Sequence, residues 1–315
     1  MSDVRRGGGH AKPLFGDAAN RLPGGDVPRG AASRGLPRWL RTIRESVAFY
    51  SLLFMLGLAC LGWQPCAALL GALLSPDAGR RIGRAAIGWF WRAYLRVLSA
   101  SGLCRFDLSD LDTLRGQPPM ILAPNHPGLL DALLIASRVP DLCCVMKADL
   151  AGNVFLGAGA RLADYIVNDA PRAMIRSARE DLRRGHPLLL FPEGTRTVEG
   201  PVGSLKGGIA LIAARARVPV QTLIIETDSP FLGKGWPVWR KPAFPVTWRV
   251  RRGRRFAPPG AAPDDTRAFV AGLQRHYASE LARGGHDDAG RGPRAAAGSE
   301  PPMRSRDART GAGKP

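Results

Sequence analysis

Hydrophobic residues form one long uncharged run near the start of the chain. Residues 47–74 contain no Asp, Glu, Lys or Arg, and the run exceeds the roughly 20 residues that a helix needs to cross a bilayer. Gln64 and Pro65 divide it, and proline removes a backbone donor and kinks a helix. Arginines flank the run on both sides, at Arg38, Arg41 and Arg44 and at Arg80, Arg81 and Arg84. Because such charges favour the cytoplasmic side, a re-entrant hairpin is favoured over a kinked single span.

An aromatic-rich stretch follows at residues 85–98. It combines Trp89, Phe90, Trp91 and Tyr94 with two arginines, as helices at a membrane interface often do. A helix packed in the protein core would show a similar apolar face, so both interpretations stay open. We expect residues 37–100 to form a helical region that is embedded in the membrane and anchors the protein.

From about residue 101 the pattern changes to short apolar runs that alternate with helical periodicity. This texture is typical of an α/β domain whose mostly parallel sheet is flanked by helices, and we assign it to residues 101–283. The predicted strands are residues 120–123, 143–146, 188–191, 218–226 and 246–250. The predicted helices include residues 170–184 and 266–281.

Charge is strongly unbalanced, with 45 Lys and Arg against 26 Asp and Glu and a net charge of +19. This favours anionic partners such as a phospholipid surface, nucleic acid or a phosphorylated substrate, and a GC-rich genome explains part of the excess. Residues 252–255 are the one internal basic patch suggestive of nucleic acid, but they lack interleaved aromatics, so no specific nucleic acid partner is expected. The Gly, Arg and Pro-rich segments 1–36 and 284–315 are predicted to be disordered basic tails.

The five cysteines show no spacing typical of a disulfide framework or a zinc site. Most of them lie inside apolar runs and are expected to be buried in a reducing compartment. The sequence therefore predicts no structural metal.

Polar residues follow three of the predicted strands, where the ligand crevice of an open α/β sheet lies. Asn125 and His126 follow the first strand, and Asp131 comes five residues after the histidine, at the start of the next helix. A carboxylate at that offset can reach the imidazole, fix its tautomer and leave the second ring nitrogen free to act as a base. A histidine near proline and glycine is also common in ordinary turns, so the pair needs its context.

The second cluster, Phe191 to Thr197, reads Phe-Pro-Glu-Gly-Thr-Arg-Thr. Its guanidinium, hydroxyls and glycine suit a phosphate. Lys147, at another strand end, and Lys206 could add positive charge. The alternative is a polar loop with a structural Arg and Glu pair.

Together the two clusters resemble the signature blocks, Asn-His-x4-Asp and Phe-Pro-Glu-Gly-Thr-Arg, of the 1-acyl-sn-glycerol-3-phosphate acyltransferase family. Both occur in order about 60 residues apart, and the resemblance covers residues 118–226. It implies that His126 is the general base and that Asp131 orients it. It also implies that Glu193, Gly194, Thr195 and Arg196 position the acceptor's phosphate, with charge from Lys147 and Lys206, and that Pro219 belongs to an acyl-donor block.

The resemblance implies transfer of a fatty acyl group from acyl-CoA or acyl carrier protein to the hydroxyl of a lysophospholipid such as 1-acyl-glycerol-3-phosphate. No cofactor is needed beyond that co-substrate, because the base activates the acceptor directly. The expected setting is phospholipid biosynthesis at the bacterial inner membrane, with the catalytic domain on the cytoplasmic face.

Several positions depart from the family pattern. Pro127 and Gly128 replace the usual polar residue and serine, Asn168–Asp169 stand where many members carry arginine, and Thr222 replaces a proline. Residues 226–242 resemble a subgroup linked to specialised lipids such as aryl polyenes. The alternatives are therefore the same chemistry on a lyso-ornithine or polyene lipid, or a non-catalytic membrane adaptor.

Overall fold

The computed structural model describes residues 37–198 and 200–289, with side chains described as far as residue 283. The predicted tail at 1–36 and nearly all of the one at 284–315 lie outside this range. Residues 37–41 belong to a separate compact unit, and all contacts given below are within the unit that starts at Thr42.

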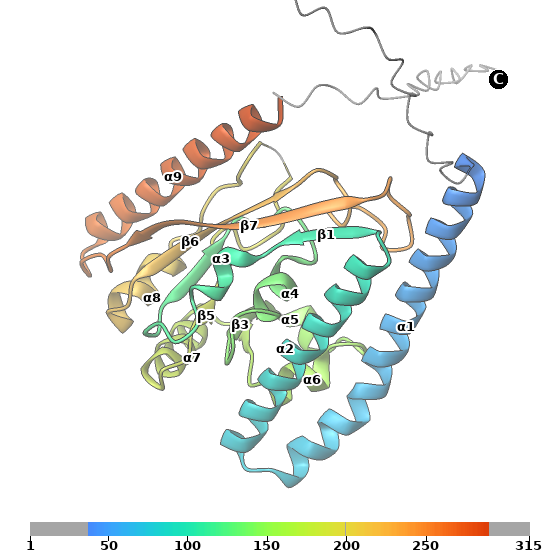
Figure 1. Ribbon diagram of the computed structural model, residues 1–315. Helices are drawn as coiled ribbons and strands as arrows, with labels where there is room; N and C mark the ends of the chain where they lie inside the picture. Colours follow the sequence, from blue (N-terminus) through green and yellow to red (C-terminus); the bar gives the residue numbers. More distant parts are fainter. Residues whose placement is uncertain (1–36, 199, 290–315) are drawn as a thin grey trace, which may run out of the picture. The chain divides into compact units, whose positions relative to one another are not determined.

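Seven strands form a single sheet in the order β1-β7-β6-β2-β5-β3-β4 (Figure 1). The strands are β1 (Cys104–Asp107), β2 (Ile121–Pro124), β3 (Cys143–Lys147), β4 (Ile166–Asn168), β5 (Leu188–Leu189), β6 (Val220–Thr227) and β7 (Val246–Phe256). Every neighbouring pair is parallel except β6 and β7. The predicted mostly parallel sheet is confirmed, and β1 and β4 are strands that the apolar pattern did not predict.

Helices cover both faces of this sheet. The short ones are α3 (Ser109–Asp112), α4 (Asp131–Ala136), α5 (Ala148–Ala151) and α6 (Gly157–Leu162), and the longer ones are α7 (Pro171–Arg183), α8 (Gly208–Ala216) and α9 (Pro263–Ala289). Successive strand residues point to opposite faces, so Ile121 of β2 packs in the core beneath α7, α8 and α9, whereas Leu122 packs in the core with α4.

The long apolar run is one helix. α1 (Arg38–Leu73) continues through Pro65, and the chain turns only at Leu74 and Ser75 before α2 (Pro76–Ala100). The expected re-entrant hairpin within residues 47–74 is therefore wrong, since one proline costs a helix one backbone bond and does not end it. Among the described residues, α1 is the one helix long and apolar enough to cross a membrane.

One side of α1 packs against the α/β domain along much of its length. Near its start, the Lys241 ammonium lies 3.1 Å from the Ser46 hydroxyl. Near its end, the Gln64 amide donates to the Phe155 carbonyl at 2.7 Å and accepts from the Ala158 N–H at 2.8 Å. The opposite side stays exposed and apolar, with Phe54 65% exposed.

α2 is a core helix with one exposed face. Trp91 and Leu95 are buried against the domain, whereas Trp89 is 70% exposed. Two of its arginines, Arg80 and Arg84, are also buried: Arg84 donates to Asp181 at 3.1 Å and to the Ala163 carbonyl at 3.0 Å. Gly83 is required beside them, because a Cβ there would lie 2.7 Å from the Ala163 nitrogen. The core interpretation of residues 85–98 is confirmed for the buried face, and the interfacial interpretation of the exposed face stays a prediction.

Candidate active site

The carboxyl ends of β2, β5, β3 and β6 meet at one edge of the sheet, and the two polar clusters lie there. β2 pairs with β5 through Leu122 and Leu189 and with β6 through Pro124 and Leu223. His126 leaves the end of β2, and residues 190–197 leave the end of β5. The sequence prediction that these clusters converge is confirmed by the hydrogen bonds between them.

His126 and Asp131 form a direct pair. The Nδ1 atom of His126 lies 2.8 Å from the Oδ2 atom of Asp131. Asp131 is the first residue of α4, and the same Oδ2 atom accepts the Gly128 N–H at 2.7 Å. The carboxylate fixes the ring with Nδ1 toward it, so Nε2, which has no hydrogen-bond partner among the described residues, is left to accept a proton.

The Asp131 carboxyl group is fully buried, whereas the His126 side chain is 18% exposed. Burial raises the pKa of Asp131, and the hydrogen bonds from His126 and Gly128 act against this by lowering it. Its Oδ1 atom is buried without a hydrogen-bond partner among the described residues. The carboxylate therefore holds the His126 Nδ1 atom and the Gly128 N–H through Oδ2 alone.

The backbone and ring face of His126 are held by the second cluster. The His126 N–H donates to the Glu193 carboxylate at 2.9 Å, and its carbonyl accepts the Thr197 N–H at 2.8 Å. The Phe191 ring stacks on the imidazole with 3.8 Å between ring centroids. His126 is therefore fixed by residues more than 60 positions away in the sequence.

The Glu193 carboxylate accepts hydrogen bonds from three donors of the protein itself. Besides the His126 N–H, its carboxylate accepts the Thr197 hydroxyl at 2.8 Å and the Gly203 N–H at 2.7 Å, and the residue is 3% exposed. An anion so enclosed has no face toward a phosphate. Glu193 therefore supports the backbone of His126 from behind, and its predicted contact with a phosphate is corrected because its carboxylate is enclosed by protein donors.

Asn125 closes the end of the sheet. Its side-chain amide donates to the Ile225 carbonyl at 2.9 Å and accepts the Ile225 N–H at 2.7 Å, and the residue is buried. This side chain imitates one more pair of ladder bonds, so β2 is fixed to β6 at the residue before His126.

The other residues that were predicted to bind the phosphate are more accessible than Glu193. Arg196 is partly buried, and its Nη1 atom donates to the Leu232 and Gly233 carbonyls at 3.1 and 3.0 Å. Gly194 has a φ of +69°, and a Cβ there would lie 3.6 Å from the Cγ atom of Lys206. Gly194, Lys206 and Lys147 are exposed, and Thr195 is partly buried. Arg196 thus faces the loop after β6, while Gly194 and Lys206 lie side by side.

Pro219 lies outside this site. Its carbonyl accepts the Ile121 N–H at 3.0 Å at the start of β6, and β6 runs parallel to β2. At about 3.3 Å per residue, Pro219 is on the order of 20 Å from His126 along the strands. Its predicted place in the acyl-donor site is therefore corrected, because the direction of β6 puts it at the opposite edge of the sheet.

An apolar cavity of about 470 Å³ borders the helix that carries Asp131. Its walls include Trp63 of α1, Phe90 of α2, Leu133 of α4 and Met146 of β3. Cys144 also lines it, and burial raises the pKa of this thiol to about 12, so the thiol stays protonated at neutral pH. No sequence pattern predicts this cavity, because its walls come from helices and strands far apart in the chain.

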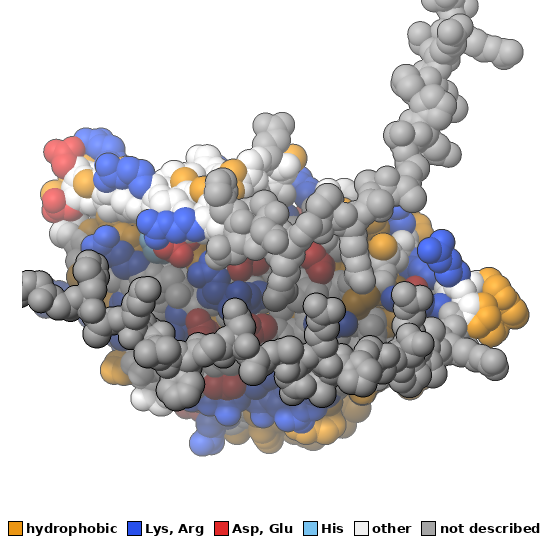
Figure 2. All heavy atoms as spheres, turned by 45° about the horizontal axis from the view of Figure 1, so that its top comes forward, with side chains coloured by type: hydrophobic (Ala, Val, Ile, Leu, Met, Phe, Trp, Pro, Cys, Tyr) orange, Lys and Arg blue, Asp and Glu red, His pale blue; other side chains and the backbone are white. Residues whose placement is uncertain are grey.

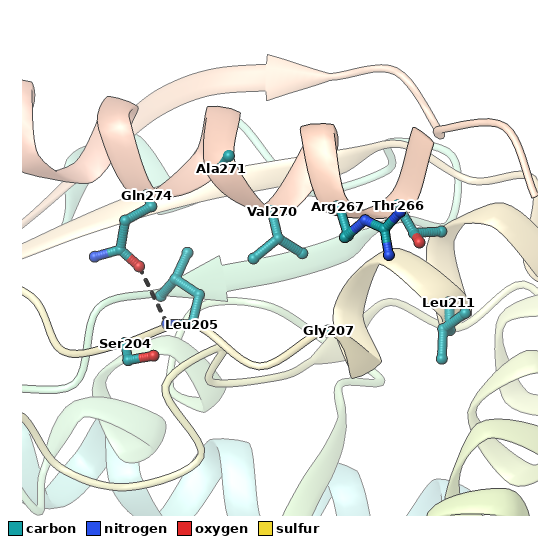
Figure 3. Close-up of a pocket in the computed structure, with 9 residues that line it drawn as sticks. All are labelled: Ser204, Leu205, Gly207, Leu211, Thr266, Arg267, Val270, Ala271 and Gln274. Atoms are coloured by element: carbon teal, nitrogen blue, oxygen red, sulfur yellow. Dashed lines mark hydrogen bonds between the residues drawn. The ribbon is translucent and has the colours of Figure 1, made fainter. Parts of the chain in front are cut away.

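α9 fixes the loop that reaches Glu193. Gln274 accepts the Leu205 N–H at 3.1 Å, as Figure 3 shows, and donates to the Gly203 carbonyl at 3.1 Å. Gly203 in turn donates to Glu193. The groove drawn in Figure 3 is lined by this segment, α8 and α9. Gln274 is a positioning residue that no motif indicated, and Phe191 lies inside the second block without a predicted role.

Two of the five arginines of β7, Arg249 and Arg251, form ion pairs. Arg251 binds Glu226 at 2.9 Å, and Arg249 lies 3.2 Å from Asp107. Figure 2 shows Lys and Arg side chains intermixed with Asp and Glu on the face that it draws. This pairing is consistent with the expectation of no specific nucleic acid partner, which stays a prediction.

Comparisons with known proteins agree with this geometry. Residues 105–226 match the family model described as Acyltransferase. A putative 1-acyl-sn-glycerol-3-phosphate acyltransferase, acl-2 of Caenorhabditis elegans, is 36% identical over 37% of this chain and 44% of its own length. The 1-acyl-sn-glycerol-3-phosphate acyltransferase of Pseudomonas aeruginosa is 26% identical over 50% of this chain and 62% of its own. The chain spans about half the length of the curated relatives it matches.

A solved structure shares the fold. The crystal structure of the 1-acyl-sn-glycerophosphate (LPA) acyltransferase PlsC from Thermotoga maritima matches with a TM-score of 0.54 and 19% identity, over 78% of this chain and 97% of that one. The resemblance predicted from the two blocks and the predicted fold class are thus confirmed. The aryl polyene subgroup stays a prediction.

Proposed function

We propose that this protein is a membrane-associated O-acyltransferase that moves a fatty acyl group from a thioester donor to the hydroxyl of a lysophospholipid such as 1-acyl-glycerol-3-phosphate. The observation that carries the proposal is the 2.8 Å pair of His126 Nδ1 and Asp131 Oδ2, with Nε2 unoccupied, beside an apolar cavity. The named relatives support the acceptor class.

In this reaction the Nε2 atom of His126 takes the proton of the acceptor hydroxyl. The hydroxyl oxygen then forms a bond to the thioester carbonyl carbon, and the carbon–sulfur bond breaks. The thiolate that leaves takes the proton back from the imidazolium, so the enzyme is unchanged after each turnover. A positioned general base of this kind contributes about 10² to 10⁴ in rate.

The apolar cavity is the proposed site of the donor's acyl chain. Ala132 and Leu133 in its wall directly follow Asp131, so a chain in the cavity would leave its thioester near the catalytic pair. The carrier, coenzyme A or acyl carrier protein, would stay outside with its anionic phosphate near exposed cations such as Lys147.

The proposed location is the cytoplasmic face of the bacterial inner membrane. The exposed apolar side of α1 supports contact with lipid, and the basic composition suits an anionic leaflet. No cofactor or metal takes part in the proposed reaction.

Mass spectrometry of the products tests the proposal. The full chain in phospholipid vesicles is incubated with acyl-CoA or acyl carrier protein and with 1-acyl-glycerol-3-phosphate, a lyso-ornithine lipid or a hydroxylated polyene lipid. We expect the diacyl phosphate product from the wild type and none from His126→Ala. A product only from the second or third acceptor would move the proposal to that lipid class, and no product with any acceptor would support the adaptor alternative.

A further inference from the structure

Residues 228–245, the β6–β7 loop, form a wall of the active site. The Leu232 carbonyl accepts the Leu129 N–H at 3.0 Å and, with the Gly233 carbonyl, accepts both hydrogen bonds of the Arg196 guanidinium. Gly233 also fits closely, since a Cβ there would lie 2.9 Å from the Pro230 carbonyl. The loop is thus bound to both signature blocks, although it belongs to neither.

A cleft of about 440 Å³ lies between this loop and the two blocks. Pro127, the neighbour of the catalytic histidine, and Thr197 line one side, and Lys234 and Arg240 line the other. The Arg240 guanidinium lies 4.7 Å above the Trp236 ring, whose Nε1 donates to the Arg240 carbonyl at 2.9 Å. Among the described residues, no carboxylate pairs with either cation. The cleft therefore carries two positive charges next to His126.

The surroundings of the cleft suit a lipid. Val198 in its lining is 65% exposed, and Trp239, which precedes Arg240, is 68% exposed. Lys241 ties the same loop to Ser46 and, at 3.6 Å, to Glu45 of α1. Exposed Trp beside Arg and Lys is the side-chain combination of a membrane interface, so this opening lies beside the apolar helix.

We propose that this cleft holds the anionic head group of the acceptor lipid, and that Lys234 and Arg240 determine which head groups are accepted. This inference rests on the proposed acyl transfer. A phosphate between the two cations would place the acceptor on the Pro127 side of His126, whereas the apolar cavity adjoins α4 on the other side of the loop. The two substrates would then approach the imidazole from different subsites.

Kinetics of Lys234→Ala/Arg240→Ala in vesicles test the cleft. With 1-acyl-glycerol-3-phosphate as acceptor, we expect the acceptor KM to rise about tenfold or more, because hydrogen bonds to charged groups are lost, while the donor KM changes little. With the uncharged acceptor monoacylglycerol, the variant and the wild type should behave alike. Arg215→Ala/Arg275→Ala, which removes two exposed cations from α8 and α9, is the matched control and should resemble the wild type.

Binding of radiolabelled 1-acyl-glycerol-3-phosphate to His126→Ala separates failure of this inference from failure of the proposed reaction, because it needs no turnover. Adding the two loop substitutions should weaken that binding by about tenfold or more. Unchanged binding and unchanged acceptor KM would overturn the inference while leaving acyl transfer standing. Displacement of the lipid by inorganic phosphate at equal concentration would also overturn it, since the ligand would then be free phosphate.

Discussion

His126 is held from four directions, by Asp131 of the first signature block and by three residues of the second cluster, residues 191–197. Asp131 fixes the ring nitrogen, Phe191 covers the ring face, Glu193 binds the backbone N–H and Thr197 binds the carbonyl. A base must lie within hydrogen-bond reach of the proton it takes. We therefore expect the second block to affect the rate of the proposed reaction as well as acceptor binding.

Glu193→Gln tests this division of roles. The amide replaces one carboxylate oxygen by an NH2 group, which faces N–H and O–H donors and leaves at least one of them unpaired. We expect kcat to fall by about tenfold or more with little change in acceptor KM. A rise in acceptor KM at constant kcat would show instead that Glu193 contacts the acceptor.

Asn125→Ala addresses the end of the sheet. The substitution leaves the buried N–H and carbonyl of Ile225 without partners, at about 1–3 kcal/mol for each group. We expect a clearly lower thermal unfolding temperature and reduced activity. Asn168→Ala, at an exposed strand end, is the control and should leave both almost unchanged; equal behaviour of the two variants would refute the assigned role.

Among the larger elements, α9 links the antiparallel pair β6–β7 to the site. His276 lies 3.0 Å from the Thr222 hydroxyl, and the Arg254 N–H donates to its Nε2 atom at 3.3 Å. Two residues before it, Gln274 holds the loop that donates to Glu193. The helix thus connects β6 and β7 to the loop that supports Glu193 and, through it, His126.

His276 gives this contact a pH dependence. Burial lowers the pKa of His276 below 6.5, and Arg254 and Arg283 lower it further, while Glu280 raises it. The unfolded chain therefore takes up this proton first as the pH falls below 6.5, so folding stability from this group is present above that pH and lost below it. Thermal unfolding at about pH 7.5 and pH 5.5 should show a smaller acid destabilisation for His276→Gln than for the wild type. Equal shifts in the two proteins would contradict this.

The apolar pattern predicted those strands that contain a run of buried apolar residues. The runs at β2, β3 and β6 are buried on both faces and read as strands at once. β1 escaped prediction because Arg105 and Asp107 in its four residues are exposed, and β4 because it has only three residues. The placement of Pro219 failed because it rested on the family resemblance alone, although the predicted strand 218–226 already put this residue at the amino end, away from the site.

The part of the candidate site that could be predicted is the part formed by reactive side chains within one motif. The pairing of His126 and Asp131 followed from their spacing, as their 2.8 Å contact confirms. The inward role of Glu193 did not, because the three donors around it come from residues 126, 197 and 203. The apolar cavity and the charged cleft depend on helices and loops that only the fold brings together.

At the scale of the whole molecule, α1 is the element that we propose contacts the membrane. Its contacts with the domain extend from Glu45 to the buried Ala67, about 33 Å at 1.5 Å per residue. That distance is comparable to the hydrocarbon thickness of a bilayer. If α1 crossed the bilayer, the charged α/β domain packed along it would have to enter the hydrocarbon as well, which is unfavourable. We therefore expect α1 to lie in the interface with its exposed apolar side toward lipid.

Cysteine labelling tests this orientation. Arg44→Cys and Ser75→Cys lie near the two ends of α1, and both should react with a membrane-impermeant maleimide from the same side of inverted vesicles. Wild-type protein, which has exposed Cys66 in α1, gives the background. Labelling of the two sites from opposite sides would show that α1 spans the bilayer.

The initial rate of acyl transfer by His126→Ala tests directly whether His126 is the general base of the proposed reaction. It is measured in vesicles with saturating donor and acceptor, beside the wild type and His186→Ala, a histidine that lies 3.8 Å from Asp141 outside the site. If His126 is the general base, we expect a loss of about 10² to 10⁴ in kcat for His126→Ala and a wild-type rate for His186→Ala. Equal rates in all three proteins would contradict this role.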